Sequence, residues 1–475
     1  MITLKNSQDI KNFFKENNFN IFGIAADAFN RLYFNDFNIN YHIIALKNNL
    51  ETDQIKKNFN VFCLEEKIGN TVYQISLNGA SIIKNIEVQK YINSFTKPYV
   101  ISYKGRSDFE DICEQNKWIS SISSSKVNEY LENKVNFRKF LIENSLSYIE
   151  GYISKLAELN FNEIEEKLGL PFVIQYPESS GGRGTFFIDN LESFTIALQR
   201  LEAFEQEKLI DTVSITKFIK GRQVSISAIA TRWGTLTSNL QFQILGVPEL
   251  LPEGANKGKF CGHDWSRSKF INKDINNEAI ILAKRFGDLI YKKLGYRGFF
   301  GLDIIIEEDT NKIYIIECNP RLTGALPTLD LIQFKDRKVQ MIPIHLLEFI
   351  AENEKDLKFN LDIDSIEADV QDYKEGCHFF VFSKSDNIIK INSNLKPGIY
   401  SLLDNQMKYI RQGYRLNDLE NNNEFIITEI SSDSWSINKG NKICRVLALN
   451  GFFNQELKIN NNWQTVVKEI FKLIN

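Results

Sequence analysis

Cysteine and histidine are scarce in this 475-residue chain, which contains six cysteines and four histidines. None of the cysteines has Cys-x-x-Cys spacing, so a zinc site and a disulfide framework are both disfavoured. The Gly-x-Ser-x-Gly sequence of a serine nucleophile is missing, and no Ser-His-Asp or Cys-His arrangement can be assigned. We therefore do not expect the chain to supply the nucleophile of a reaction.

A strong net charge and long apolar runs are also missing. Lysine and arginine number 57 and aspartate and glutamate 60, and this balance argues against a nucleic-acid partner attracted by bulk charge. No apolar stretch approaches the ~20 residues that cross a bilayer, and the first residues lack a signal-peptide core. We expect a cytoplasmic protein without a membrane or nucleic-acid partner.

The chain is long enough for several folding units, because one hydrophobic core rarely supports 475 residues. Its first 122 residues alternate apolar strand candidates with helical or polar stretches, which is typical of an α/β unit. Beyond about residue 372, short β-like runs alternate with turn residues before a final helix. Helices are predicted at 124–144, with Ser124 as N-cap, and at 191–206, 276–294 and 463–473.

The segment from Gly301 to Pro320 predicts an acidic hairpin. Two β-rich runs flank the turn-forming residues 309–311, and a three-residue loop there places Asp303 opposite Glu317. Asn319 lies on the same face as Glu317, because side chains alternate with period two. Three oxygen-bearing side chains should therefore meet on one face of the hairpin.

Facing carboxylates repel each other and need a counterion. Two carboxylates and an amide oxygen suit Mg²⁺, which keeps water and phosphate oxygens as its remaining ligands. The alternative is an edge hairpin with solvated acids. The apolar flanks at 299–300, 304–306 and 314–316 disfavour that alternative.

Two further segments fit a nucleotide. The glycine-rich loop 179–184 lies between two strand candidates and lacks the Gly-Lys-Ser/Thr ending, so it is not a Walker A loop. Its glycines would instead let backbone N–H groups bind phosphate, with the loop acting as a flexible flap. At 217–219 a strand ends beside a turn, where backbone groups can meet an adenine edge. An ordinary glycine turn and a plain hairpin are the respective alternatives. The segment 246–269 is predicted to be a loop too long for a mere connector.

The order of basic helix, flap, hinge strand and acidic hairpin, ending in Glu317-Cys-Asn-Pro-Arg321, resembles the ATP-grasp superfamily over about residues 124–330. Within that superfamily the chain looks most like the pheganomycin-type peptide ligases, on 131–138, where Asn133 stands in place of a common Asp, and on 260–265. The resemblance implies an α/β and α+β chain. Its expected parts are a pre-ATP-grasp α/β domain at 1–122, a first ATP-grasp lobe with the glycine flap at 123–210, a second lobe with the metal hairpin at 211–355, and a small β-rich C-terminal domain at 356–475.

The resemblance also implies roles for individual residues. ATP and Mg²⁺ are the expected cofactors, with one or two metal ions, and Mn²⁺ could replace Mg²⁺. The metal ligands are expected to be Asp303, Glu317 and Asn319. These three and Arg321 are the expected catalytic residues. ATP-binding residues are then Lys134, Arg138, Gln175, Gly181, Gly182, Arg183, Gly184, Lys217, Phe218 and Ile219. Substrate residues are Lys259, His263, Asp264, Arg267, Thr323 and Gly324. A structural role for His263 and a helix N-cap role for Thr323 are the alternatives.

The implied activity is ATP-dependent ligation of a carboxylate to an amine through an acyl phosphate, with release of ADP and phosphate. Amino acids or peptides are the expected substrates, and a homodimer is compatible with the resemblance. Two rivals stay open: a ligase with a thiol, hydroxyl or bicarbonate acceptor, and an ATP-binding sensor or scaffold without catalysis. The sensor stays open because Gln175 replaces a common lysine, and Thr216, Lys217 and Gln223 stand where glutamates are common. The C-terminal domain would cover the substrate site, mediate dimerisation or only stabilise the lobes.

Overall fold

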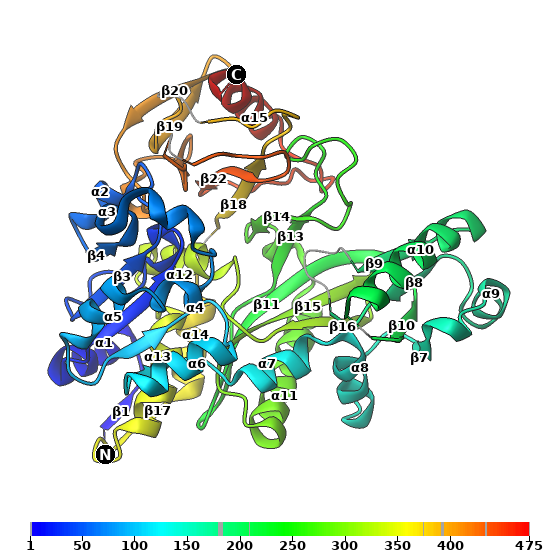
Figure 1. Cartoon of the computed structure of the whole chain (residues 1–475), viewed down its shortest axis with the longest axis horizontal. Coiled ribbons are helices and arrows are strands. Elements are labelled where there is room, and N and C mark those ends of the chain that lie inside the picture. The colour runs from blue at the N-terminus through cyan, green and yellow to red at the C-terminus, as the bar shows by residue number, and fades with distance from the viewer. Residues whose placement is uncertain are drawn as a thin grey trace.

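The structure of the protein is a computed structural model, and it describes residues 2–178, 184–208, 210–373, 375–390, 394–432 and 435–474. Three sheets dominate it, and a fourth, two-stranded sheet pairs β1 (Ile2–Leu4) with β17 (Phe359–Leu361) in parallel. Figure 1 shows the N-terminal region on the left, the strands after residue 377 at the top, and a small lobe that projects to the right.

The N-terminal region is built on a five-stranded parallel sheet with the order β4-β3-β2-β5-β6. This confirms the α/β expectation, because the apolar runs predicted as strands are fully buried between helices. The strands are β2 (Ile21–Ala25), β3 (Tyr41–Ala45), β4 (Asn60–Cys63), β5 (Tyr99–Ile101) and β6 (Ile119–Ser120). The helices are α1 (Ser7–Asn17), α2 (Thr52–Lys56), α3 (Leu64–Ile68), α4 (Gly79–Ile83), α5 (Ile86–Asn93) and α6 (Ser107–Gln115).

The small lobe contains a four-stranded antiparallel sheet with the order β7-β10-β8-β9. Its strands are β7 (Gly151–Lys155), β8 (Phe172–Gln175), β9 (Thr185–Ile188) and β10 (Thr212–Lys217), and its helices are α9 (Phe161–Leu168) and α10 (Leu191–Lys208). Apolar side chains of the sheet and both helices form a separate core. The predicted flap joins β8 to β9, but residues 179–183 lie outside the described residues.

The largest sheet has eleven strands and runs through the second half of the chain in the order β16-β15-β11-β13-β14-β18-β22-β21-β19-β20, with β12 also paired to β11. The pairing of β14 with β18 joins the strands predicted for the second lobe to the β-rich C-terminal strands. The division at residue 355 therefore stays a prediction, since one sheet crosses it. The strands are β11 (Gly221–Thr231), β12 (Gly234–Thr237), β13 (Gln241–Leu245), β14 (Phe260–Asp264), β15 (Gly298–Glu307), β16 (Ile313–Asn319), β18 (Cys377–Phe382), β19 (Gly398–Leu403), β20 (Gln406–Arg411), β21 (Glu424–Thr428) and β22 (Lys442–Ala448).

Helices cover the two faces of the large sheet unequally. The long α11 (Lys273–Leu294) packs against one face of β11, β12 and β15, and α8 (Lys134–Glu143) contributes to the same core. On the opposite face, α12 (Leu326–Lys335) and α13 (Met341–Asn353) join the core of the N-terminal region. The remaining helices are α7 (Ser125–Glu132), α14 (Ile363–Gln371) and α15 (Asn461–Ile474). The acidic end of the β15–β16 hairpin lies on the face of α12 and α13.

Two predicted elements differ from the structure. The single helix expected at 124–144 is two helices, α7 and α8, because Asn133 ends the first in an extended conformation and caps the second with its side chain. The long loop expected at 246–269 contains β14. In β14, Gly262 has a φ of +148°, and a Cβ there would lie 2.1 Å from the carbonyl oxygen of His378, so only glycine lets β14 lie against β18 at this point.

No helix in the described part of the chain is long and apolar enough to span a membrane.

Candidate functional site

The acidic hairpin forms with the predicted pairing. Asp303 faces Glu317 and Gly301 faces Asn319 across β15 and β16. The turn is longer than the predicted three residues, because β15 ends at Glu307 and β16 begins only at Ile313. Next to the turn, Ile306 pairs with Ile313, one residue off the predicted register. A β-bulge between the turn and the acids shifts the register back by one residue and restores the predicted pairs.

Asp303 is held by amide donors. Asn319 Nδ2 donates to its Oδ2 at 3.0 Å, and Gln243 Nε2 on β13 donates to its Oδ1 at 2.8 Å. Burial and the neighbouring charge of Glu317 raise the pKa of Asp303 to about 7. Glu317 has its own counterion, because Lys134 Nζ lies 2.7 Å from its Oε1. The negative charge of the pair is thus only partly compensated by protein groups.

Arg321 reaches the same place from just beyond β16. Its Nη2 donates to Asn319 Oδ1 at 2.6 Å and its Nε lies 3.2 Å from Glu132 Oε1, while Nη1 donates to the phenol of Tyr103. Tyr103 follows β5 of the N-terminal region, so Arg321 links that region to the hairpin. A guanidinium in this position can hold an oxyanion beside the acidic pair.

Helix α8 supplies two cations from the first turns after its cap. Asn133 Oδ1 accepts hydrogen bonds from the backbone N–H groups of Val135 and Asn136, which orients the helix start. Lys134 at the first position pairs with Glu317. Arg138, one turn later, is 5% exposed, and its Nε and Nη2 have no hydrogen-bond partner among the described residues. Burial lowers the pKa of Arg138, so this cation lacks the anion that would offset its desolvation.

The residues predicted for the nucleotide lie at the junction of the small lobe and the large sheet. Phe218 is 36% exposed and its ring lies 6.0 Å from that of Phe187 on β9, which the sequence analysis did not select. Ile219 is buried in a small apolar cluster with Tyr314, and the side chain of Lys217 is exposed. Gln175 Nε2 donates to Thr185 Oγ1 at 3.4 Å, at the end of β8 that leads into the flap.

Of the flap residues, only Gly184 can be placed. Its carbonyl oxygen accepts a hydrogen bond from Tyr176 N at 2.8 Å. Gly181, Gly182 and Arg183 lie outside the described residues. Their predicted contact with phosphate remains a prediction.

Three of the predicted substrate residues lie together on the face that carries Asp303. His263 Nε2 lies 3.3 Å from Ser225 Oγ, and Ser225 pairs directly with Asp303. A Cβ at Gly301 would lie 2.7 Å from Thr323 Cγ2, so Thr323 covers the same face. Gly324 lies beside Phe260. The predicted N-cap role of Thr323 is wrong, because α12 begins after Ala325 and Thr323 Oγ1 has no hydrogen-bond partner.

The other three predicted substrate residues lie elsewhere. Asp264, next to His263 on β14, points to the opposite face and accepts hydrogen bonds from Ser266 N and Phe453 N at 2.8 and 2.9 Å. Lys259 Nζ donates to Gly440 O at 2.8 Å. The guanidinium of Arg267 lies over the ring of Phe270, with 4.3 Å between its Cζ and the ring centroid. The structure does not bring these three side chains to the acidic pair.

Sequence reasoning missed four residues that contact the predicted ones. Gln243 holds Asp303, Tyr103 and Glu132 hold Arg321, and His378 lies opposite His263. Glu132 lies within the segment 131–138, and the other three belong to no recognisable motif. Each becomes visible only when the strand order places distant segments side by side.

The donor set fits a hard divalent cation. Among the described residues, no group of three or more His, Cys, Asp or Glu side chains is arranged to hold a metal ion. The candidate site therefore consists of two facing carboxylates and one amide oxygen, which is a usual protein contribution to a Mg²⁺ site completed by water and phosphate. Of the two cations of α8, Lys134 contacts this donor set directly, through Glu317.

Comparison with known proteins agrees with this geometry. Residues 131–325 match the family described as ATP-grasp domain. The chain is 25% identical over 256 residues to the [butirosin acyl-carrier protein]–L-glutamate ligase of Niallia circulans, covering 51% of this chain and 54% of that protein. It is 28% identical over 205 residues to the D-alanine–D-alanine ligase of Flavobacterium psychrophilum, covering 40% and 57%. The chain thus spans about half the length of these curated relatives.

The fold has relatives among solved structures. The biotin carboxylase of Campylobacter jejuni, solved as a β-γ-ATP complex, superposes with a TM-score of 0.60 at 13% identity, covering 91% of this chain and 87% of that one. At this identity the likeness concerns the fold alone. Together with the match of residues 131–325 to the ATP-grasp domain family, it confirms the predicted fold class.

Proposed function

We propose that this chain is an ATP-dependent carboxylate–amine ligase that releases ADP and phosphate. The observation that carries the proposal is the pairing of Asp303 with Glu317 beside Asn319, with Lys134 of α8 next to them. The ligases among the curated relatives support the reaction class. Amino acids or peptides are the proposed substrates, and the cytoplasmic location and the homodimer remain predictions.

The proposed roles follow from charge. Asp303, Glu317 and Asn319 would hold Mg²⁺, which when bound neutralises the charge of the transferring phosphate. Lys134 and Arg138 would bind phosphate oxygens, because Lys134 lies at the acidic pair and Arg138 lacks an anion. The side chains at the end of β10, with Phe187, would cover the adenine.

In the proposed reaction, the substrate carboxylate attacks the γ-phosphate of ATP and ADP leaves. The amine nitrogen then attacks the acyl carbon, the C–O bond to phosphate breaks, and the amine loses a proton. Arg321 would stabilise the oxyanion that forms at the acyl carbon, since its guanidinium lies beside Asn319. Phosphoryl transfer requires alignment and charge neutralisation rather than a protein nucleophile, which fits the scarcity of nucleophilic motifs.

The test compares wild type with Asp303→Asn and Glu317→Gln. Each substitution removes one charge from the pair, so ADP release with mixtures of amino acids as acid and amine should fall by at least ~100-fold while the fold is kept. Glu308→Gln, at the exposed end of the same hairpin, is the matched control, because its carboxylate pairs only with Lys220 in the described contacts.

The product identifies the acceptor. A product mass equal to acid plus amine less water, formed with ADP, supports the ligase. ADP release that depends on a thiol, a hydroxyl or bicarbonate favours the first rival. Tight ATP binding without turnover under any pairing favours the sensor, and wild-type turnover by either acidic-pair variant would show that the metal assignment is wrong.

A further inference from the structure

The four histidines of the chain fall into two contrasting pairs. All four are at most 5% exposed. Both ring nitrogens of His42 and of His345 lie 2.7–2.9 Å from a hydrogen-bond partner. His263 and His378 differ, because three of their four ring nitrogens have no partner among the described residues.

The two unpartnered histidines face each other. His263 on β14 pairs with His378 on β18, and their ring centroids are 5.4 Å apart. Only His263 Nε2 has a neighbour, Ser225 Oγ at 3.3 Å. His263 Nδ1 and both nitrogens of His378 are buried without a partner.

An unpartnered polar atom in the interior loses its hydration without gaining a hydrogen bond that offsets the loss. His42 and His345 show that this chain pairs its buried imidazoles elsewhere. The exceptions occur at one place, where both members of a cross-strand pair keep free nitrogens. Such a cluster calls for a partner that comes from outside the chain.

Aromatic rings surround the pair. The ring of Phe260 lies 4.8 Å from that of His263, Phe380 lies 5.4 Å from His378, and Trp265 lies 5.6 Å from both. Burial, and then the positive charge of Arg445, lower the pKa of His263 to about 3 and that of His378 well below its usual value. Both rings are therefore neutral at pH 7, and each carries one N–H donor.

Charge decides which group fits. The guanidinium of Arg445 lies over the ring of Phe380, with 4.8 Å between its Cζ and the ring centroid, and this positive charge disfavours an ammonium group and favours a carboxylate or carbonyl oxygen. The N–H groups of two neutral imidazoles can donate to such an oxygen. We call the pair with its three aromatic neighbours the histidine box.

The histidine box lies next to the acidic pair on the same face of the sheet. Ser225 contacts His263 and pairs with Asp303 on the neighbouring strand, about 5 Å away. Gln243 pairs with His263 across β13 and β14 and donates to Asp303 Oδ1. A small molecule with one carboxylate at the acidic pair can therefore extend toward the box.

Phe260 is the most exposed of the aromatic rings that touch His263. Phe260 is half-buried, whereas both histidines are fully covered. Across from it, a Cβ at Gly324 would lie 3.3 Å from Phe260 Cε1, so the glycine leaves the ring the space that a side chain would take. Rotation of this ring away from His263 would expose the unpartnered nitrogens.

We propose that His263 and His378 form a recognition subsite for a carboxylate or carbonyl group that the acid substrate carries in addition to the carboxylate that is ligated. This inference rests on the proposed ligase function. It assigns the substrate class: acids with a second oxygen acceptor, such as acidic or amide amino acids.

The first test compares acids of equal carbon chain length. ADP release is measured with L-glutamate, L-glutamine and glutarate, and with L-norvaline and valerate, which end in a methyl group. Wild type should prefer the oxygen-bearing acids by at least tenfold in kcat/KM. In His378→Phe the KM for these acids should rise at least tenfold with little change in kcat, and His378→Gln, which restores an N–H donor, should recover part of the loss.

The second readout is stability. Because His378 makes no hydrogen bond, His378→Phe should keep or raise the Tm. His42→Phe is the matched control, because it removes two hydrogen bonds and should lower the Tm while leaving the KM unchanged. A lower Tm of His378→Phe with unchanged KM would mean that only a buried water satisfies the ring, and would overturn the subsite.

A third readout is independent of turnover. Protein with ¹⁵N-labelled histidine rings contains only four imidazoles, and glutarate added with Mg²⁺ and a non-hydrolysable ATP analogue should shift the ring nitrogens of His263 and His378 but not those of His42. Absence of these shifts, or equal use of L-norvaline and L-glutamate, contradicts the subsite while the ligase stands. Absence of ADP release with every acid and amine contradicts the ligase instead, and the ring shifts alone then decide whether the box binds an oxygen acceptor.

Discussion

Arg138 is the residue whose surroundings most directly indicate an external anion. Its guanidinium is buried one turn beyond Lys134, contacts the ring of Tyr148, and has two nitrogens without a partner among the described residues. A protein rarely buries a cation in this way, because the lost hydration is not recovered. Helical periodicity alone places Arg138 on a buried face but does not reveal this missing partner.

Arg138→Leu should therefore weaken nucleotide binding without unfolding the protein. Loss of a charge-assisted hydrogen bond costs ~1.5–3 kcal/mol, or roughly 10- to 100-fold in Kd. Calorimetry with a non-hydrolysable ATP analogue measures this change, and Lys139→Leu on the exposed side of α8 is the matched control. An unchanged Kd in Arg138→Leu would remove this residue from the phosphate site.

Arg321 should act after nucleotide binding. Its guanidinium lies beside Asn319 and Glu132, so Arg321→Ala should lower product formation by about 10²–10³-fold, as for loss of an oxyanion donor. The Kd for the ATP analogue should change far less. Arg321→Lys keeps the charge but not the planar fork, and should recover only part of the activity. Product formation at the wild-type rate in Arg321→Ala would exclude this role.

At the scale of elements, the acidic hairpin has one feature that the sequence predicts correctly, its residue pairing, and one that it does not, its turn length. Alternation and turn residues predicted that Asp303 faces Glu317, and this is confirmed. The predicted three-residue turn is wrong, and the pairing survives only because a bulge corrects the register. Turn length and bulges depend on local twist and packing, which alternation does not encode.

The pairing of β14 with β18 could not be predicted from the sequence. The residues on either side of Gly262 read as loop, because glycine and scattered polar residues disfavour a strand. The strand forms because β13 and β18 flank it on both sides. His378 belongs to no local motif for the same reason, since its partner His263 lies in another strand more than a hundred positions earlier.

The break between α7 and α8 yields a prediction about an element. Asn133→Ala removes the cap of α8 and should lower the free energy of unfolding by about 1 kcal/mol. The same substitution should also weaken ATP binding, because the cap orients the turn that carries Lys134. Asn160→Ala removes an equivalent side-chain cap from α9, and should cost similar stability without affecting ATP binding. If Asn133→Ala and Asn160→Ala bind ATP with the same affinity, the cap of α8 does not contribute to nucleotide binding.

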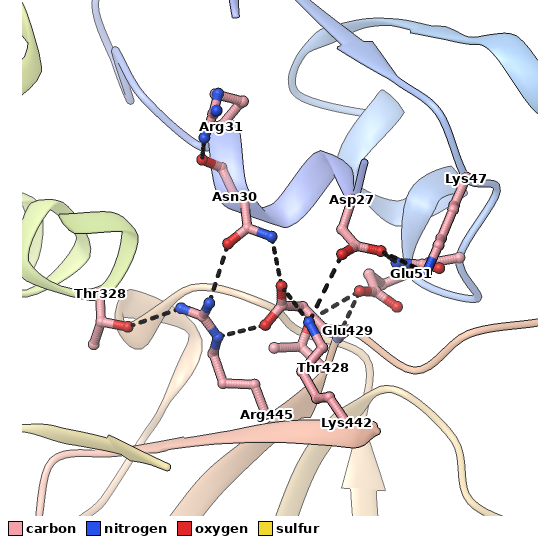
Figure 2. A network of polar contacts seen from close by, with 11 residues as sticks. Asp27, Asn30, Arg31, Lys47, Glu51, Thr328, Thr428, Glu429, Lys442 and Arg445 are labelled. Atoms are coloured by element: carbon pink, nitrogen blue, oxygen red, sulfur yellow. Dashed lines mark hydrogen bonds and ion pairs between the residues drawn. The ribbon is translucent and has the colours of Figure 1, made fainter. Parts of the chain in front are cut away.

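At the scale of the whole molecule, a network of buried charged residues links the N-terminal region to the C-terminal strands. Figure 2 shows Arg445 on β22 between Glu429, Asn30 and Thr328, with contacts from the N-terminal region, α12 and the C-terminal strands. Lys442 pairs with Glu429 at 2.9 Å. Segments some four hundred residues apart meet here, so no local pattern could predict the network.

Within this network, Glu51 is an acid whose pKa lies above its usual value. Its Oε1 accepts hydrogen bonds from Glu429 N at 2.7 Å and from Thr428 Oγ1 at 3.1 Å (Figure 2), while Oε2 has no partner. Burial, with smaller contributions from the charges of Asp27 and Glu429, raises the pKa of Glu51 to about 7 from 4.5. Between these two values the folded protein keeps a proton that the unfolded chain has released.

The contribution of Glu51 to stability should therefore fall as the pH rises from 5 to 8, because the Glu51 carboxyl binds more protons in the folded state than in the unfolded state in this window. Each pKa unit corresponds to ~1.4 kcal/mol, so Glu51 should cost roughly 3 kcal/mol by pH 8. Glu51→Gln keeps the acceptor oxygen and has no proton to lose, so it should match wild type at pH 5 and exceed its stability at pH 8. Urea unfolding at both pH values measures the difference, with Glu66→Gln, a partly exposed acid paired with Lys56, as the control. Wild-type and Glu51→Gln curves that stay parallel from pH 5 to 8 would show that Glu51 is already charged in the folded protein.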